Sequence, residues 1–387
     1  MQRGVILLPH FTTFPSITRY CMKKMSTTPS PVIPRFVSVE GGDIFSRSQP
    51  DGFRFRLVSY NILAQVYVKS SFFPHSPKPC LRWKARSQAI LTVLKNLEAD
   101  FLCLQEVDEY DGFYRANMEK TGYTSVYVQR TGEKRDGCGI FYRQDRAELV
   151  LVDRIEYNDL VDSIQEITDS SDIHNDEMSN GNSDAKTKCA SPVKKSTDDH
   201  ADPRVRMKRD CVGILAAFRL KGSPGQLIII ANTHIYWDPE WADVKLAQAK
   251  YLLSRLARFR TKVSDKFESF PPVIVAGDFN SIPGDKVYQY MVSGHSSSVV
   301  PGCSDDLLIP LQSVYGSTRG EPSFTNCTPG FTNTIDYIFF SPSQDLKPAG
   351  ILELPESDSP EVIGWLPNNH HPSDHLPIGA EFELVDG

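Results

Sequence analysis

Short apolar runs alternate with longer periodic stretches along the chain from Phe53 onward. The short runs predict strands, and the stretches in which apolar residues recur every three or four positions predict amphipathic helices. The predicted strands cover 53–62, 100–107, 123–129, 138–142, 212–220, 227–235 and 272–279. Strands interleaved with helices indicate a layered α/β domain rather than a helical bundle or an all-β sandwich.

Two helices are predicted from their apolar stripes. The first runs from about Trp83 to Leu97, and the second begins at Pro239, a residue type that is favoured in the first turn of a helix. The stripe residues are Ile90, Val93, Leu94 and Leu97 in the first helix, and Leu246, Ala249, Leu252, Leu253 and Leu256 in the second.

A polar segment at about 169–202 interrupts this pattern between two predicted strands. It has almost no aromatic or branched apolar residues, so it is predicted to be a disordered acidic insertion. The net charge of the chain is -6, but residues 151–203 hold 13 Asp and Glu against 5 Lys and Arg, which leaves 35 acidic and 37 basic residues elsewhere. The charge of the folded body is therefore nearly neutral, and a nucleic-acid substrate stays compatible with it.

Residues 1–52 are predicted to be a disordered or targeting segment ahead of a catalytic domain at 53–385. The first acidic residue is Glu40, and the preceding residues mix Lys and Arg with many Ser and Thr, as organellar transit peptides do. A mitochondrion or plastid is therefore the alternative to the cytoplasm and/or nucleus. Eight cysteines without a CxxC pair favour reduced thiols, and no apolar run reaches the roughly 18 residues that span a bilayer, so no membrane partner is expected.

Several predicted strands end in a carboxylate, an amide or a histidine. A single carboxylate at a strand end is usually a solvated turn or a helix cap. Several such ends that meet at one rim of a sheet would instead form a pocket of oxygen and imidazole groups. The residues at these positions are Asn61, Glu106, Asn232, His234, Asp278 and Asn280, joined later in the chain by Asp336 and His375.

A pocket of this composition suits a hard divalent cation. Magnesium prefers one or two carboxylates together with water and substrate phosphate. A bound cation would also offset the repulsion among Glu106, Asp278 and Asp336, which would otherwise raise the pKa of at least one of them. The sequence therefore predicts a site for Mg²⁺, for which Mn²⁺ would substitute.

The motifs around these residues resemble those of the exonuclease-endonuclease-phosphatase superfamily, most closely its carbon catabolite repressor-type deadenylase and nocturnin branch. The resemblance covers roughly 53–385 and implies a two-layered β-sandwich flanked by helices. In chain order the motifs are SYNIL at 59–63, LQEVD at 104–108, DGCGIF at 136–141, NTHIYWDP at 232–239, AGDFNS at 276–281, TIDYIF at 334–339 and PSDHLPI at 372–378.

The resemblance also implies the metal ligands and the group that acts on water. Glu106 is similar to the main magnesium ligand of the family, and Asn61 and Asp278 assist it. Asp278 also resembles the residue that orients or deprotonates the attacking water molecule. The chemistry implied is thus hydrolysis of a phosphoester by metal-assisted attack of water.

Four further residues match positions that contact or surround the substrate phosphate in this family. Asn280 resembles the residue that holds a phosphate oxygen, and His234 resembles the second histidine that contacts the phosphate. His375, paired with Asp336, resembles the histidine that stabilises the pentacovalent phosphorus. An imidazolium would neutralise charge that develops on phosphoryl oxygens, and the Asp would fix its tautomer and raise its pKa.

Two apolar residues carry the prediction of the substrate. In deadenylases of this branch a proline after the NTHxxWDP motif and a phenylalanine before the IDYIF strand pinch the terminal adenine, and Pro239 and Phe331 match them. Asn326 resembles an amide that helps to read the base. The structural alternative is a helix-starting proline and a core aromatic. The residues expected to bind substrate are Asn232, Pro239, Asn280, Asn326 and Phe331.

Together these matches predict a magnesium-dependent 3′-to-5′ exoribonuclease that acts on the poly(A) 3′ end of single-stranded mRNA. No leucine-rich repeats precede Phe53, so incorporation into the large deadenylase complex is not expected. An NADP(H) 2′-phosphatase of nocturnin type is the alternative with the same catalytic residues. A non-catalytic RNA-binding module is the alternative from another class, and it is disfavoured because the predicted metal and catalytic residues are all present.

Overall fold

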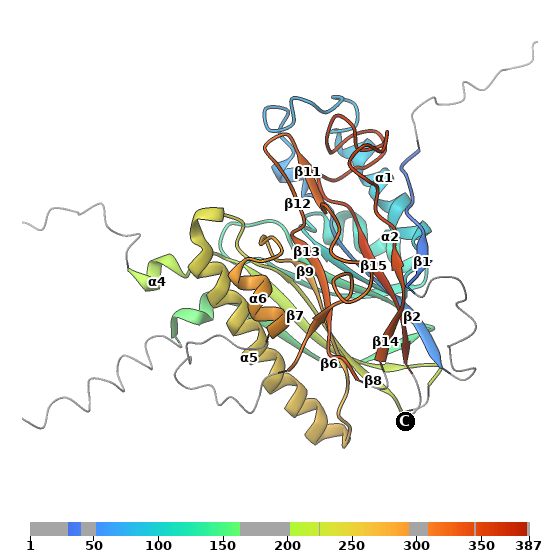
Figure 1. Cartoon of the computed structure of the whole chain (residues 1–387), viewed down its shortest axis with the longest axis vertical. Coiled ribbons are helices and arrows are strands. Elements are labelled where there is room, and N and C mark those ends of the chain that lie inside the picture. The colour runs from blue at the N-terminus through green and yellow to red at the C-terminus, as the bar shows by residue number, and fades with distance from the viewer. Residues whose placement is uncertain are drawn as a thin grey trace, which may run out of the picture.

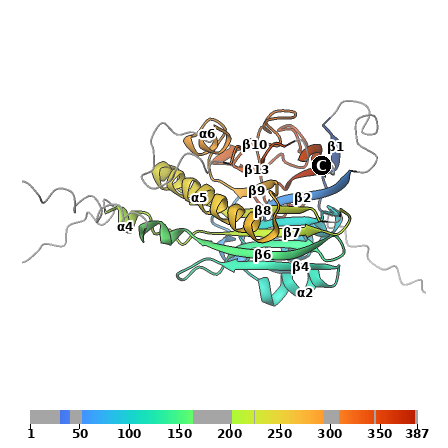
Figure 2. The same ribbon diagram turned by 90° about the horizontal axis from the view of Figure 1, so that it is seen from below.

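The computed structural model describes residues 30–39, 52–162, 202–223, 225–293, 309–343 and 346–384. In this part of the chain two β-sheets pack face to face, and helices cover the outer face of each sheet (Figures 1 and 2). The two-layered sandwich flanked by helices is therefore confirmed. The predicted acidic insertion, apart from its last residue, and residues 1–29 and 40–51 of the predicted N-terminal segment lie outside the described residues.

The first sheet has seven strands in the order β1-β14-β15-β2-β3-β5-β4. Its central strands β2 and β3 are parallel, and the other neighbours are antiparallel. Helices α1 and α2 pack on its outer face. The bounds are β1 (Phe36–Ser38), β2 (Phe53–Asn61), η1 (Gln65–Tyr67), α1 (Trp83–Asn96), β3 (Phe101–Gln105), η2 (Tyr110–Tyr114), α2 (Arg115–Glu119), β4 (Tyr123–Gln129), β5 (Gly137–Arg143), β14 (Leu346–Leu352) and β15 (Ile378–Leu384).

The second sheet has six strands in the order β10-β13-β9-β8-β7-β6, with β8 and β9 parallel. Helices α5 and α6 cover its outer face, and β11 and β12 form a separate small hairpin. None of the described helices is long and apolar enough to cross a membrane. The bounds are β6 (Ala147–Glu156), η3 (Tyr157–Asp159), α4 (Pro203–Arg206), β7 (Val212–Leu220), β8 (Leu227–His234), η4 (Pro239–Trp241), α5 (Ala242–Phe267), β9 (Val273–Asp278), α6 (Lys286–Ser293), β10 (Gln312–Ser313), β11 (Asn326–Thr328), β12 (Phe331–Asn333) and β13 (Asp336–Phe340).

The core between the sheets follows from the alternation of side chains along each strand. On β2, Phe53, Phe55 and Leu57 face the opposing sheet, whereas Val58 and Tyr60 face α1. Strands that are covered on both faces read as continuous apolar runs, which is why the central strands are recognisable in the sequence. The same alternation determines which polar side chains face inward at the ends of the strands.

The predicted strands and both predicted helices are present, with two differences from the predicted pattern. Pro239 begins a 3₁₀ turn, η4, and the α-helix itself starts at Ala242. Strand β6 is absent from the predicted elements because it lies at the edge of its sheet, where several of its residues are charged and only partly covered. The described cysteines 80, 103, 138, 211 and 327 are buried and unpaired, in agreement with the prediction of reduced thiols.

Residues 30–39 belong to the folded body, which corrects the predicted boundary at residue 53. Strand β1 pairs with β14 at the edge of the first sheet. The guanidinium carbon of Arg56 lies over the Phe36 ring, 4.7 Å from the centre of that ring. The Val32 N–H also donates to the carbonyl oxygen of His370 at 3.0 Å. A three-residue strand is too short to stand out in a sequence, because its stability comes from a distant pairing partner.

Candidate active site

The inward-facing row of side chains changes from apolar to polar at one end of the sandwich. On β9, for example, Ile274 and Ala276 face the core and Asp278 continues the same row at the end of the strand. Because side chains alternate with a period of two, the polar ends of several strands meet in the space between the sheets. The residues that end the inner rows are Asn61 on β2, Gln105 on β3, His234 on β8 and Asp278 on β9, and Asp336 begins the row of β13.

Strand register places three of these residues side by side. His234 is the partner of Asp278 across the parallel pair β8–β9, and Asp336 is the partner of Asp278 across the antiparallel pair β9–β13. The close approach of β8 and β9 here requires glycine, because a Cβ at Gly277 would lie 2.1 Å from the carbonyl oxygen of Thr233. The glycine in the AGDFNS motif is therefore explained by backbone packing beside Asp278.

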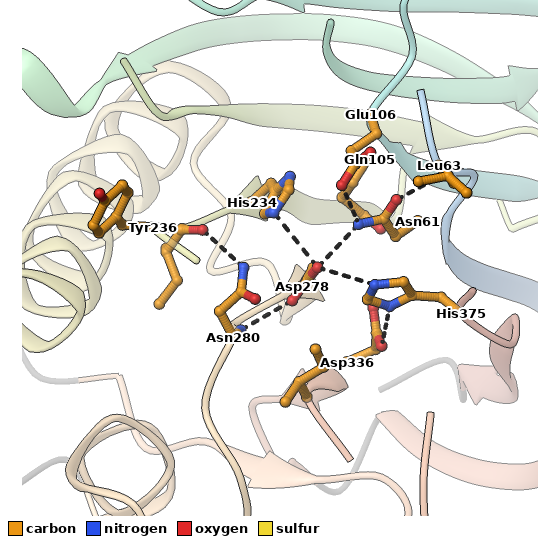
Figure 3. A network of polar contacts seen from close by, with 12 residues as sticks. Asn61, Leu63, Gln105, Glu106, His234, Tyr236, Asp278, Asn280, Asp336 and His375 are labelled. Carbon is orange, nitrogen blue, oxygen red and sulfur yellow. Dashed lines mark hydrogen bonds and ion pairs between the residues drawn. The ribbon is translucent and has the colours of Figure 1, made fainter. Parts of the chain in front are cut away.

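The side chain of Asn61 joins two carboxylates (Figure 3). Its amide nitrogen donates to Glu106 Oε1 and to Asp278 Oδ2, each at 3.0 Å. Glu106 has a left-handed backbone with φ of 58°, and its second oxygen accepts a hydrogen bond of 2.9 Å from the Ala64 N–H. The predicted metal ligands Glu106, Asn61 and Asp278 are thus brought together at one edge of the site.

The protein itself offers little positive charge to balance the carboxylates of the site. Burial raises the pKa of Glu106 to about 7, and the charges of Asp374 and Asp136 add to this effect. Burial and the neighbouring Asp336 raise the pKa of Asp278 to about 7, although His375 acts in the opposite direction. One oxygen of Asp336, Oδ1, is buried without a hydrogen-bond partner. Buried oxygen atoms that resist carrying charge fit a divalent cation, which would stabilise their ionised form.

Among the described residues, one set has donor atoms that lie close enough together for a cation. The ligand atoms of Asp278, Asp336 and His375 lie within 4.8 Å of one another. His375, however, uses Nδ1 in a hydrogen bond of 2.8 Å to Asp336, and a protonated imidazole has no lone pair for a metal. The carboxylates of Glu106 and Asp278 are therefore the better metal ligands. The amide nitrogen of Asn61 faces both of them, and its Oδ1 accepts from the Leu63 N–H at 3.0 Å, so Asn61 links the two carboxylates in this structure.

The two histidines of the site differ in protonation. Burial disfavours the charged form of His375, but the adjacent Asp336 carboxylate outweighs burial and raises the pKa well above the ordinary value. Burial, together with the charges of Arg130 and His375, lowers the pKa of His234 well below the ordinary value. Their Nε2 atoms lie 3.8 Å and 3.5 Å from Asp278 Oδ2, respectively. The site therefore presents one imidazolium and one neutral imidazole beside the same carboxylate.

The two asparagines that the sequence assigns to substrate binding near these strands have different surroundings. Asn280 lies beside Asp278, because its N–H donates to Asp278 Oδ1 at 2.9 Å and its amide donates to the Ile235 carbonyl at 3.1 Å (Figure 3). Asn232 is fully buried between the sheets, where it accepts from Gln105 and donates to two backbone carbonyls. We correct the prediction for Asn232: it supports the sheet below the site, and its side chain has no group left for a substrate.

The predicted adenine contacts lie in two places, the β11–β12 hairpin and the turn η4. Phe331 on β12 is 41% exposed, so it is not a core aromatic. Pro239 is exposed at the start of η4, where Asp238 caps the turn, so it also fits the helix-starting alternative. Asn326 on β11 forms an isolated bridge with His375, which places the β11–β12 hairpin beside the His375–Asp336 pair.

Arg86 is a buried residue of the site region that the sequence patterns do not single out. Its guanidinium donates to the carbonyl oxygens of Ile62, Leu63 and Pro372 and to Gln65 Oε1. These acceptors lie on the loop that follows Asn61 and on the segment that leads into His375. Arg86 therefore ties the loop after Asn61, at the edge with Glu106 and Asp278 (the metal edge), to the segment that carries His375. Arg86 lies on α1, and the residues next to it in the sequence do not indicate which carbonyl groups it contacts.

Replacing Arg86 by Met is expected to lower the free energy of unfolding by about 3 to 5 kcal/mol, because it leaves several buried carbonyl oxygens without a donor. Urea unfolding followed by circular dichroism measures the change. The exposed Lys84 on the same helix provides the matched control, Lys84→Met, which should have little effect. A loss below about 1 kcal/mol for Arg86→Met would contradict the bracing role.

Comparison with known proteins identifies the family of the chain. Residues 58–375 match the Endonuclease/Exonuclease/phosphatase family. Carbon catabolite repressor protein 4 homolog 4 of Arabidopsis thaliana is 57% identical, over 94% of each chain. The CCR4-Not complex 3′-5′-exoribonuclease subunit Ccr4 of Mycosarcoma maydis is 30% identical over 85% of this chain, which spans 50% of the fungal protein.

Solved structures show the same fold. The crystal structure of ANGEL2, a 2′,3′-cyclic phosphatase, in complex with adenosine-2′,3′-vanadate has a TM-score of 0.66 and 27% identity, and the match covers 91% of this chain and 99% of that one. The human Nocturnin catalytic domain has a TM-score of 0.59 at 23% identity, over 91% and 97% of the two chains, and this likeness concerns the fold alone. The chain therefore belongs to the endonuclease/exonuclease/phosphatase family of hydrolases, in its carbon catabolite repressor-type branch.

Proposed function

We propose that this protein is a magnesium-dependent 3′-to-5′ exoribonuclease that removes adenylates from the poly(A) 3′ end of RNA. The observation that carries the proposal is the edge formed by the partly buried Glu106 and the buried Asn61 and Asp278, beside the His375–Asp336 pair. The name of the fungal relative, an exoribonuclease subunit, supports an RNA substrate. The chain spans half of that fungal protein. That this protein acts without joining the CCR4-Not complex, and where in the cell it acts, are predictions.

The residues of the metal edge bind the cation and handle the proton of the attacking water. Glu106 and Asp278 would hold the ion, and the amide of Asn61 joins the two carboxylates. The magnesium ion, when bound, supplies positive charge to the phosphoryl group and lowers the pKa of water. Asp278 Oδ2 lies 3.5 Å from His234 Nε2 and 3.8 Å from His375 Nε2, so its ionised carboxylate is placed among the groups that would surround the phosphate and can accept the proton from water.

The two histidines lie where the negative charge of the phosphoryl oxygens increases. His375 is kept protonated by Asp336, so its Nε2–H can donate to a phosphoryl oxygen as charge develops there. His234 is neutral and offers a hydrogen bond without a second positive charge. Asn280, held beside Asp278 by its own backbone N–H, is the amide available to a further phosphate oxygen.

A small-molecule phosphatase is the second candidate function. The structural likeness to ANGEL2, named as a 2′,3′-cyclic phosphatase, favours it, because the same metal edge and histidines would serve such a substrate. Purified protein should be assayed on 5′-labelled RNA with a 3′ A tract, on adenosine 2′,3′-cyclic phosphate and on NADPH. Stepwise shortening of the RNA, at a kcat/KM well above the other two, is the expected result. If phosphate is released from NADPH, or the cyclic phosphate is opened, at a higher kcat/KM than the RNA is shortened, the phosphatase candidate would be correct and the exoribonuclease proposal wrong.

The substitution Phe331→Ala is expected to lower kcat/KM on A-ending RNA about 5- to 150-fold, which corresponds to a lost stacking contact of about 1 to 3 kcal/mol. Hydrolysis of a small generic phosphodiester should change much less, because the metal edge and the histidines are untouched. Initial rates on A-tailed RNA, U-tailed RNA and the generic ester measure the difference.

Phe270 provides the matched control for this variant. It is 73% exposed and precedes β9 at the end of the strand opposite Asp278, so Phe270→Ala should leave all three rates unchanged. An equal loss on the three substrates with Phe331→Ala would show that the ring supports the hairpin β11–β12 and does not recognise adenine.

A further inference from the structure

An arginine–aromatic cluster lies directly beyond the catalytic end of β8. It consists of Arg206, Arg209, Tyr236, Trp237 and Trp241. The guanidinium carbons of Arg206 and Arg209 lie 3.9 Å and 4.0 Å from the centre of the Trp241 ring, and Arg209 also lies 5.4 Å from the ring centre of Tyr236. The Tyr236 ring contacts both tryptophans, with centres 6.1 Å from Trp237 and 5.8 Å from Trp241.

The cluster is tied to the catalytic residues through the backbone. Tyr236 follows His234 by two residues, and Figure 3 shows it on the same side of Asp278 as Asn280. The Ile235 N–H donates to the carbonyl oxygen of Asp278 at 3.1 Å, and the Tyr236 N–H donates to Gln248 Oε1 at 2.8 Å. These bonds fix the position of the cluster relative to the place where the phosphate is cleaved.

Two members of the cluster have binding capacity that the fold does not use. The Trp237 side chain is 61% exposed. Arg209 makes no ion pair among the described residues, and its Nε atom is buried without a hydrogen-bond partner, while one terminal nitrogen donates to the Lys208 carbonyl. Arg206, in contrast, forms a bidentate pair with Asp243 at 2.7 Å and 2.8 Å, so it serves to hold the loop.

A hollow adjoins the cluster at the residue after Arg209. Asp210 lines this open space of about 640 Å³ together with Tyr67, Lys134 and Arg135. Glu133 lies in the same lining, so the hollow offers both charges and room for a chain that leaves the site. The Tyr67 hydroxyl at the wall of the hollow donates to the buried Asp136 at 2.6 Å, and the charge of Asp136 acts on Glu106.

We propose that the arginine–aromatic cluster binds the nucleotides on the 5′ side of the scissile phosphate in single-stranded RNA. A base stacks on the exposed face of Trp237, and a phosphate pairs with Arg209. Indole and guanidinium planes accept any unpaired base, and arginine recognises phosphate oxygens. This inference rests on the proposed function, and it adds a second binding site that makes catalysis depend on the length of the RNA.

The test compares a 12-residue oligoadenylate with the dinucleotide ApA, which has no nucleotide to place on the cluster beyond the one next to the cleaved bond. In Trp237→Ala and in Arg209→Gln the KM for the 12-mer should rise about 5-fold or more, with kcat within about twofold. The KM for ApA should change several times less. Using both variants guards against a loss of folding in one of them.

Phe270 and Arg260 form a matched control pair, because the Arg260 guanidinium lies 3.5 Å from the centre of the exposed Phe270 ring, away from the site. The variants Phe270→Ala and Arg260→Gln should behave as the wild type on both substrates. Unchanged KM values in the cluster variants, equal losses on the 12-mer and ApA, or an equal loss in the control pair would each overturn the inference.

Failure of the proposed function is distinguishable from failure of this inference. If the wild type hydrolyses neither oligoadenylate, the exoribonuclease proposal is wrong, and fluorescence anisotropy with a labelled 12-mer then decides on the cluster. Binding that weakens at least about 5-fold in Trp237→Ala supports the cluster as an RNA site. Absence of binding by the wild type, or the same affinity in the variant, overturns it.

Discussion

Replacing Glu106 by Gln is expected to lower kcat/KM about 1000-fold or more, with the fold retained. The substitution removes one of the two carboxylates that Asn61 joins, and with it the charge that holds the cation. A 1000-fold loss corresponds to about 4 kcal/mol of transition-state stabilisation, which is within the range that metal-ion catalysis provides. The side-chain amide of Gln is close in shape to the carboxylate of Glu. The amide oxygen of Gln can therefore still accept the hydrogen bond from the Ala64 N–H.

Rates on A-tailed RNA in magnesium, manganese and excess EDTA measure this effect, with circular dichroism as the check on folding. Glu109→Gln is the matched control, because Glu109 is an exposed carboxylate three residues further along the same loop. The wild type should lose activity in EDTA and regain it when magnesium is restored. Full activity in EDTA, or a Glu106→Gln enzyme that works at the wild-type rate, would contradict a metal site at this edge.

Most of the site residues are predictable from the sequence because they end apolar strands. Asn61, His234 and Asp278 each continue an inward-facing row, and the period of two fixes their direction as soon as the strand is recognised. The arrangement of the strands is not contained in that pattern. The family motifs supply it, since they identify which strand ends meet.

Other features depend on contacts that no local pattern reveals. Asn232 resembles a site residue in the sequence, yet it faces the buried amide of Gln105 one step below the site. Arg86 reaches carbonyl oxygens on two loops that lie 23 and 286 residues away along the chain. Strand β1 depends on pairing with β14 at the other end of the sequence. Long-range partners of this kind can be identified only in the folded structure.

Replacing Asp336 by Asn is expected to lower kcat about 100- to 10,000-fold, the range found when the carboxylate partner of a catalytic histidine is removed. Asp336 holds His375 Nδ1 at 2.8 Å and is itself fixed by a hydrogen bond of 2.6 Å from Thr325 Oγ1. Without the Asp336 carboxylate, only the charges of Asp278 and Asp374 still oppose the effect of burial, so the pKa of His375 falls. The imidazolium fraction then falls as the pH rises, so the loss should be larger at pH 8 than at pH 6.

A double-mutant cycle separates this role from a general weakening of the site. Asp336 acts through His375, so the variant that combines Asp336→Asn with His375→Gln should be about as slow as the slower single variant. Rates for the wild type, both single variants and the double variant on the same A-tailed RNA provide the four values. Because Asp278 lies on the neighbouring strand, in register with Asp336, each variant also needs its dependence on magnesium concentration measured. Losses that multiply in the double variant would show that Asp336 acts on the metal edge independently of the histidine.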